Sequence, residues 1–100
     1  MEKYDKLVRD NIPNILDAKN FPYELEVLDN EKYKIELIKK LGEEVAEFLV
    51  EGDVEELADV IEVVEALKKL PEYQNVYDVR MQKLEEKGGF EKKFKMKGEK

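Results

Sequence analysis

Residues 40–67 read KLGEEVAEFLVEGDVEELADVIEVVEAL, and this stretch decides the fold. Gly52 stands where a left-handed residue typically ends a helix, and Asp53 is a residue type that caps the next one. We therefore expect one helix from about Glu31 to Glu51 and a second from about Val54 to Leu70. Because so short a connection leaves no room for another arrangement, the two helices should form an antiparallel hairpin.

Both expected helices carry an apolar stripe at helical spacing. The stripe on the first helix consists of Ile38, Leu41, Val45 and Phe48. The stripe on the second helix consists of Leu57, Val60, Ile61, Val64 and Leu67. Two or three helices bury only part of these faces, so we expect a homo-oligomer, a dimer or a dimer of dimers, that completes a larger bundle.

Further elements should flank the hairpin. Pro13 suits the first turn of a short helix, and the N-terminal segment is expected to be helical in two pieces. A third helix is expected from about Pro71 to Lys87. Residues 21–28 alternate apolar and charged side chains, which predicts a short strand. Residues 90–97 show a weaker alternation, and we expect them to pair with this strand. The predicted fold class is mainly α, a helical hairpin with flanking helices and short terminal β pairing.

The composition limits the chemistry. The chain has 100 residues, which fits a single domain over residues 1–100, and it contains neither Cys nor His. Thiolate nucleophiles, disulfides and the usual zinc ligands are therefore excluded. Ser and Thr are also absent, so that carboxylates, Lys, Arg and Tyr remain for catalysis or binding.

The charge and hydropathy limit the partners. The formal net charge is −7, and no basic run is dense enough to neutralise a phosphate backbone, which argues against binding to duplex nucleic acid. The apolar runs are too short for a membrane span or a signal peptide. We therefore expect a cytoplasmic protein without a membrane partner.

Acidic side chains line the edges of both apolar stripes. At about 100° per residue, one line along the first helix contains Lys40, Glu44, Glu47 and Glu51, and the second helix places Glu56 and Asp59 one turn apart. The hairpin should bring together four of these carboxylates: Glu44, Glu47, Glu56 and Asp59. Two like charges about 5 Å apart repel by roughly 3 kcal/mol at an effective dielectric near 20. Since Mg²⁺ prefers oxygen ligands, we expect these four residues to bind Mg²⁺, with Mn²⁺ as an alternative.

The same residues allow a second interpretation. Acidic patterns of this kind are common on solvated helices, Lys40 can pair with Glu44, and Glu56 can close a capping box with Asp53. The acids would then belong to a non-catalytic helical dimer or interaction module.

Four segments together resemble a known family. They are KLVRDNIPNIL at 6–16, KLGEEVAEFL at 40–49, EELADVIEVVEAL at 55–67 and KGGF at 87–90. This ordered set resembles the small MazG-like, phosphoribosyl-ATP-pyrophosphohydrolase-like proteins of the all-α nucleotide pyrophosphohydrolase superfamily. The resemblance implies an all-α NTP pyrophosphohydrolase-like bundle in which Glu44, Glu47, Glu56 and Asp59 bind Mg²⁺. The connector at residues 48–55 is shorter than in many members, and no motif selects the nucleotide.

The implied activity is Mg²⁺-dependent cleavage of the α–β phosphate bond of a nucleoside triphosphate or related nucleotide, giving a monophosphate and pyrophosphate. Phosphoribosyl-ATP is the alternative substrate. Without Ser, Thr, Cys or His, a metal-activated water is the best nucleophile, and Glu44 or Glu47 should take its proton.

Cationic side chains should bind the phosphates. The candidates are Lys6, Arg9, Lys40, Arg80 and Lys83. Arg9 is the first choice, because the chain contains only Arg9 and Arg80 among its many lysines. A structural pairing of Arg9 with Asp5 or Asp10 is the alternative, and the cations at 80 and 83 could equally form a solvated face.

Overall fold

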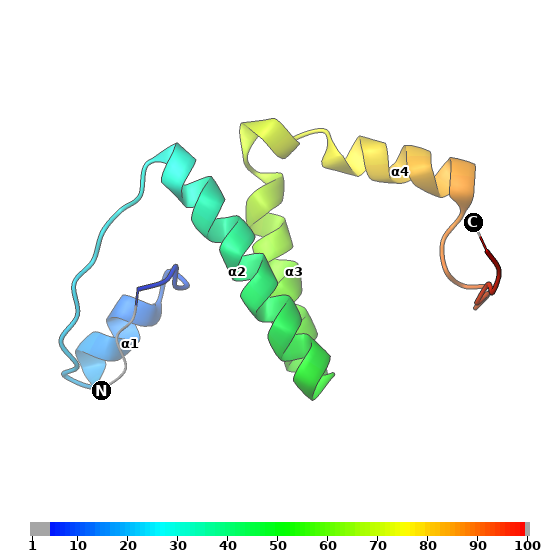
Figure 1. Cartoon of the computed structure of the whole chain (residues 1–100). Helices are drawn as coiled ribbons and strands as arrows, with labels where there is room; N and C mark the ends of the chain where they lie inside the picture. Colours follow the sequence, from blue (N-terminus) through cyan, green and yellow to red (C-terminus); the bar gives the residue numbers. More distant parts are fainter. Residues whose placement is uncertain (1–4, 100) are drawn as a thin grey trace.

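The computed structural model of the chain describes residues 5–99 and is built from helices. In chain order these are α1 (Ile12–Ala18), α2 (Asn30–Glu51), α3 (Val54–Lys68), the 3₁₀ turn η1 (Pro71–Tyr73) and α4 (Val76–Lys87), as Figure 1 shows. The mainly α fold class is confirmed. Over the described residues, no helix is long and apolar enough to cross a membrane.

The predicted antiparallel hairpin is formed by α2 and α3, which pack along each other (Figure 1). The Asp29 carboxylate caps α2 by accepting the Lys32 backbone N–H at 2.9 Å. Gly52 ends α2 with φ +64°, and its N–H donates to the Phe48 carbonyl at 2.7 Å. Asp53 then caps α3 through the Glu56 backbone N–H at 2.9 Å. Local capping chemistry therefore sets the turn that brings the two helices together.

The core lies between α2 and α3 near the end of the hairpin that is remote from the Gly52 turn. Its buried residues are Leu37, Val63 and Leu70. Partly buried apolar side chains pack against them: Leu7, Tyr33, Leu41, Ala66, Leu67 and Tyr73. Through Leu7 the N-terminal segment packs against the hairpin.

The apolar stripes that face each other differ from the predicted ones. On α2 the partly or fully buried line is Leu37, Leu41, Glu44 and Phe48. Ile38 is 47% exposed, and on α3 Val63 is buried whereas Ile61 is 51% exposed. Each helix carries two apolar stripes, and periodicity alone does not say which of them meets the partner helix.

The ends of the chain also differ from expectation. From residue 5 onward, the N-terminal segment contains one helix, α1, because residues 5–11 are not helical. Residues 21–29 join α1 to α2 without forming a strand, and residues 90–99 form none either, so the predicted β pairing is wrong. Figure 1 gives the reason: α4 leads away from the hairpin and carries the C-terminal tail far from the α1–α2 connection.

The third helix, expected from Pro71 to Lys87, is divided into η1 and α4. It is separate from α3, which ends at Lys68 before Pro71 begins η1. A salt bridge of 3.4 Å between Lys34 and Glu72 ties η1 to α2, and the Lys34 ammonium lies 5.2 Å from the centre of the Tyr73 ring. Beyond η1 the chain turns outward into α4 (Figure 1).

Candidate metal centre

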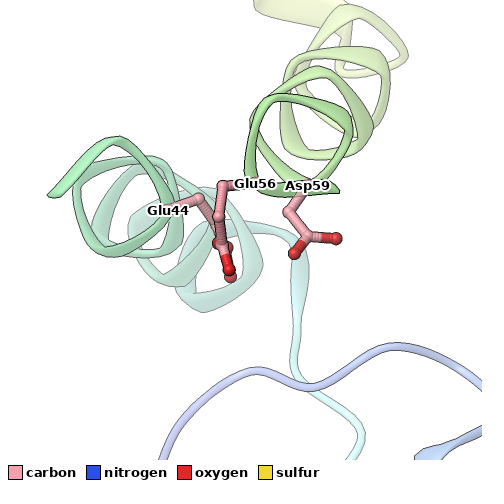
Figure 2. Close-up of side chains that lie close together, drawn as sticks. All are labelled: Glu44, Glu56 and Asp59. Atoms are coloured by element: carbon pink, nitrogen blue, oxygen red, sulfur yellow. The ribbon is translucent and has the colours of Figure 1, made fainter. Parts of the chain in front are cut away.

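Three acidic side chains converge across the hairpin. Glu44 comes from α2, and Glu56 and Asp59 come from the first turns of α3. Each offers a carboxylate oxygen, and these oxygens lie within 4.8 Å of one another. Figure 2 shows the three carboxylates pointing to one side of the helix pair. We call these three residues the acidic triad.

Glu44 occupies a position where an apolar residue would be expected. It follows Leu41 and precedes Phe48 on the stripe that faces α3, and only 9% of its surface is exposed. The 4,3,4 spacing of Leu37, Leu41, Glu44 and Phe48 is also a core spacing, so the sequence contains this stripe beside the predicted one without choosing between them. The predicted stripe used Ile38 and Val45 instead and left Glu44 at its edge.

Two oxygens of the triad are buried without a partner. Neither Oε2 of Glu44 nor Oε2 of Glu56 has a hydrogen-bond partner. Buried carboxylate oxygens are normally hydrogen-bonded, ion-paired or bound to a metal, because desolvation without compensation is costly. These two unpartnered oxygens are therefore where a proton or a cation would stabilise the site.

The electrostatics at Glu56 agree with this. Burial raises the pKa of Glu56 above its ordinary value, and the negative charges of Glu47, Asp53 and Asp59 raise it further. All of these effects disfavour a bare carboxylate. A proton or a cation would relieve the repulsion.

Glu47, the fourth predicted ligand, lies beside the triad rather than in it. Its charge acts on Glu56, and its own side chain is exposed. It lines an open pocket of about 380 Å³ together with Ala46, Val50, Glu51 and Glu56. The structure thus brings three of the four predicted ligands together and leaves Glu47 at the rim, where solvent and small molecules can reach it.

Two of the predicted phosphate-binding cations lie at the acids. Lys40 is mostly buried and lies 3.5 Å from Glu44 Oε1 and 3.4 Å from Glu43, so it is engaged by carboxylates. Arg9 lies 3.0 Å from Asp59. Arg9 therefore reaches the site from the N-terminal segment, and its partner is Asp59 rather than the nearby acids considered from the sequence.

Two of the remaining candidate cations, Arg80 and Lys83, lie elsewhere. Lys6 is an exposed residue of the same N-terminal segment as Arg9. Arg80 and Lys83 belong to α4, which leads away from the hairpin, so one chain does not bring them to the triad (Figure 1). The Arg80 guanidinium instead lies 5.7 Å from the centre of the Tyr77 ring and 3.6 Å from the Met81 sulfur.

The donor set fits a hard divalent cation. All ligands offered by the triad are carboxylate oxygens, which suit Mg²⁺ and Mn²⁺ better than zinc or copper. A search of protein-family models, of curated proteins and of solved structures finds no match for this chain.

Proposed function

We propose that this protein is a Mg²⁺-dependent nucleotide pyrophosphohydrolase of the MazG-like kind, with Mn²⁺ as an alternative cofactor. Its reaction would be cleavage of the α–β phosphate bond of a nucleoside triphosphate or related nucleotide. The observation that carries the proposal is the pair of buried, unpartnered Oε2 atoms of Glu44 and Glu56 beside Asp59.

The residues divide the work as follows. Glu44, Glu56 and Asp59 would hold the divalent ion, which when bound neutralises phosphate charge and lowers the pKa of water. Glu47, exposed at the rim, is the better of the two predicted proton acceptors, because Glu44 is buried. Arg9 is exposed and adjacent, and it can exchange Asp59 for a phosphate oxygen.

The rival interpretation, a solvated acidic face of a non-catalytic module, explains the triad less well. A solvated glutamate needs no place in an apolar stripe, whereas Glu44 is nine-tenths buried between Leu41 and Phe48. Lys40 pairs with Oε1 of Glu44 only, and a buried carboxylate oxygen without a partner destabilises a protein and is typical of functional sites.

Metal binding is tested first. Thermal unfolding with and without Mg²⁺ or Mn²⁺ is expected to show stabilisation of the wild type, because a ligand that binds only the folded state raises its stability. The Glu44→Gln and Asp59→Asn variants should lose this response. Glu62→Gln, which removes an exposed charge from α3, is the matched control and should keep it. Equal stabilisation of all four proteins would contradict the site.

Catalysis is tested separately. Canonical, deoxy and modified nucleoside triphosphates and phosphoribosyl-ATP are incubated with each metal, and monophosphate and pyrophosphate are measured. We expect release of both products from at least one compound, and its loss in Glu44→Gln. Metal-dependent stabilisation without turnover on any compound would support the non-catalytic interpretation instead.

A further inference from the structure

The two carboxylate oxygens of Glu44 are in different surroundings. Glu44 is nine-tenths buried on α2, and its Oε1 atom lies 3.5 Å from the Lys40 ammonium. Its Oε2 atom is also buried but has no hydrogen-bond partner. Because both oxygens of a carboxylate are acceptors, pairing at Oε1 alone leaves Oε2 as the oxygen that is available to a ligand.

Lys40 is held in place from a second side. Its ammonium also lies 3.4 Å from Oε2 of Glu43, the residue before Glu44 on α2. The Lys40 side chain is only 18% exposed, whereas the side chain of Arg9, the cation beside Asp59, is 58% exposed. Lys40 is therefore a fixed part of the hairpin, while Arg9 has room to leave its partner.

An ordinary surface salt bridge does not account for the pair of Lys40 and Glu44. Exposed pairs four residues apart on a helix keep both partners in water and contribute little to stability. Here both side chains are largely withdrawn from water, and the cost of burying them is only partly offset, because one Glu44 oxygen stays unpaired. The pair is a poor stabiliser, but it fixes the Glu44 carboxylate in one orientation.

The number of oxygens that a carboxylate offers bears on the choice of metal. Ca²⁺ takes about six to eight oxygen ligands and often binds both oxygens of one carboxylate, whereas Mg²⁺ requires a near-octahedral set and keeps several waters. Mn²⁺ also accepts octahedral oxygen ligands. With Oε1 held by Lys40, Glu44 can offer one oxygen only, which suits Mg²⁺ and Mn²⁺ better than Ca²⁺.

We propose that Lys40 is a positioning residue of the metal site and sets its preference for Mg²⁺ and Mn²⁺ over Ca²⁺. It holds Oε1 of Glu44 and leaves Oε2 to the ion. This role takes the place of the phosphate binding expected for Lys40 from the sequence, because its ammonium is engaged by Glu43 and Glu44. The inference rests on the metal site of the proposed function, but not on catalysis.

Metal preference is measured by titration calorimetry of the full chain with Mn²⁺ and with Ca²⁺, in the absence of nucleotide. The wild type is expected to bind Mn²⁺ at least about tenfold more tightly than Ca²⁺. In Lys40→Met both oxygens of Glu44 become available, so this ratio of dissociation constants should fall by about tenfold. Loss of a competing cation raises both affinities, and the second oxygen raises that for Ca²⁺ further. A wild type without the preference would overturn the proposal.

Two variants serve as controls. Lys39→Met removes the same charge from the exposed neighbour, which pairs with Glu36, and should keep the wild-type ratio. Lys40→Arg keeps a cation at the position and should keep the preference for Mn²⁺. If Lys40 merely supported the structure, Lys40→Met would loosen the site and weaken the binding of both metals by the same factor. An unchanged ratio in Lys40→Met would therefore overturn the proposal.

Circular dichroism checks that the variants fold. If Lys40→Met is unfolded without metal, its recovery of helix is titrated with each ion, and the ratio of the two midpoints reports the same preference. A variant that stays unfolded with both ions would show that Lys40 only supports the fold, and would overturn the proposal.

Hydrolysis is assayed separately, so that a failure of catalysis is told apart from a failure of the positioning role. A wild type that prefers Mn²⁺ in the predicted way but hydrolyses no nucleotide would overturn the catalytic proposal alone, whereas one that binds neither ion would overturn both. Where hydrolysis is found, Lys40→Met at saturating Mn²⁺ should lower kcat with little change in KM. A raised KM with unchanged kcat would mean that Lys40 binds the phosphates, and would overturn the positioning role.

Discussion

The Nη2 atom of Arg9 lies 3.0 Å from Oδ1 of Asp59, a residue fifty positions away in the chain. This ion pair holds the N-terminal segment against α3. It also gives one member of the acidic triad a cationic partner, while Oε2 of Glu44 and Oε2 of Glu56 have none. A divalent ion bound by the triad would therefore compete with Arg9 for Asp59.

Replacing Arg9 with glutamine should separate these two roles. Both partners are exposed, 58% and 41%, and such a pair contributes about 0.2–1 kcal/mol, so Mn²⁺ affinity should rise up to about fivefold. The proposed nucleotide hydrolysis should fall, because Arg9 is the cation proposed to bind the phosphates. Calorimetry measures the first effect and product release the second. Arg80→Gln, the other arginine of the chain, should change neither, and unchanged Mn²⁺ affinity in Arg9→Gln would contradict the competition.

Replacing Glu44 with leucine should raise the stability of the metal-free protein while abolishing its response to Mg²⁺. The leucine completes the stripe of Leu37, Leu41 and Phe48 and removes a buried, partly unpaired charge, whereas Lys40 keeps Glu43 as a partner. We expect a gain of about 1–2 kcal/mol, which corresponds to a melting temperature higher by roughly 4–16 °C.

Urea and thermal unfolding in EDTA check this gain. Glu62→Leu, at an exposed position of α3, should change stability much less and leave the Mg²⁺ response intact. A metal-free Glu44→Leu protein less stable than the wild type would mean that the carboxylate supports the fold rather than a ligand.

The salt bridge between Lys34 and Glu72 should make stability depend on pH at both extremes. The hydrogen bond from its own backbone and the Lys34 ammonium lower the pKa of Glu72. The ionised Glu72 carboxylate therefore stabilises the folded protein at pH values above its ordinary pKa, and this stabilisation is lost as the pH falls through the lowered pKa. The Glu72 carboxylate raises the pKa of Lys34. The stabilisation by the Lys34 ammonium is therefore lost only as the pH rises through this raised pKa.

Urea midpoints measured across pH should therefore decline at both ends in the wild type. Lys34→Met should remove the alkaline part and weaken the acidic part. Lys39→Met, which breaks an exposed pair with Glu36 within α2, should leave both parts as they are. Identical pH profiles for wild type and Lys34→Met would show that η1 is not held to α2 by this pair.

Replacing Gly52 with alanine should loosen the hairpin. Gly52 has φ +64°, and nothing lies within 4 Å of a Cβ placed there, so the change acts through backbone strain and not through a clash. We expect a loss of about 1–2 kcal/mol, measured by urea unfolding. Asparagine tolerates this conformation better, so Gly52→Asn should lose less than half as much. Equal losses in both variants would argue against a left-handed turn at this position.

Some of the fold could be predicted because it depends on neighbours in the chain. Asp29, Gly52 and Asp53 interact with backbone groups within four residues of themselves, and Gly52 and Asp53 act at the helix ends where they were expected. The spacing of Glu44, Glu56 and Asp59 about that turn was then sufficient to predict that they meet. The strand expected at residues 21–28 failed, because a strand also needs a partner, and α4 carries the C-terminal tail away from it.

The sequence by itself determined the helical hairpin and placed Glu44, Glu56 and Asp59 among four acids expected to meet, since capping and helical spacing are local properties. Only the tertiary structure decided which of two apolar stripes is buried on each helix, that Glu44 lies within the buried one, and that Arg9 reaches Asp59. These outcomes depend on packing between residues far apart in the chain, and a one-dimensional pattern carries no information about which distant surface a helix will meet.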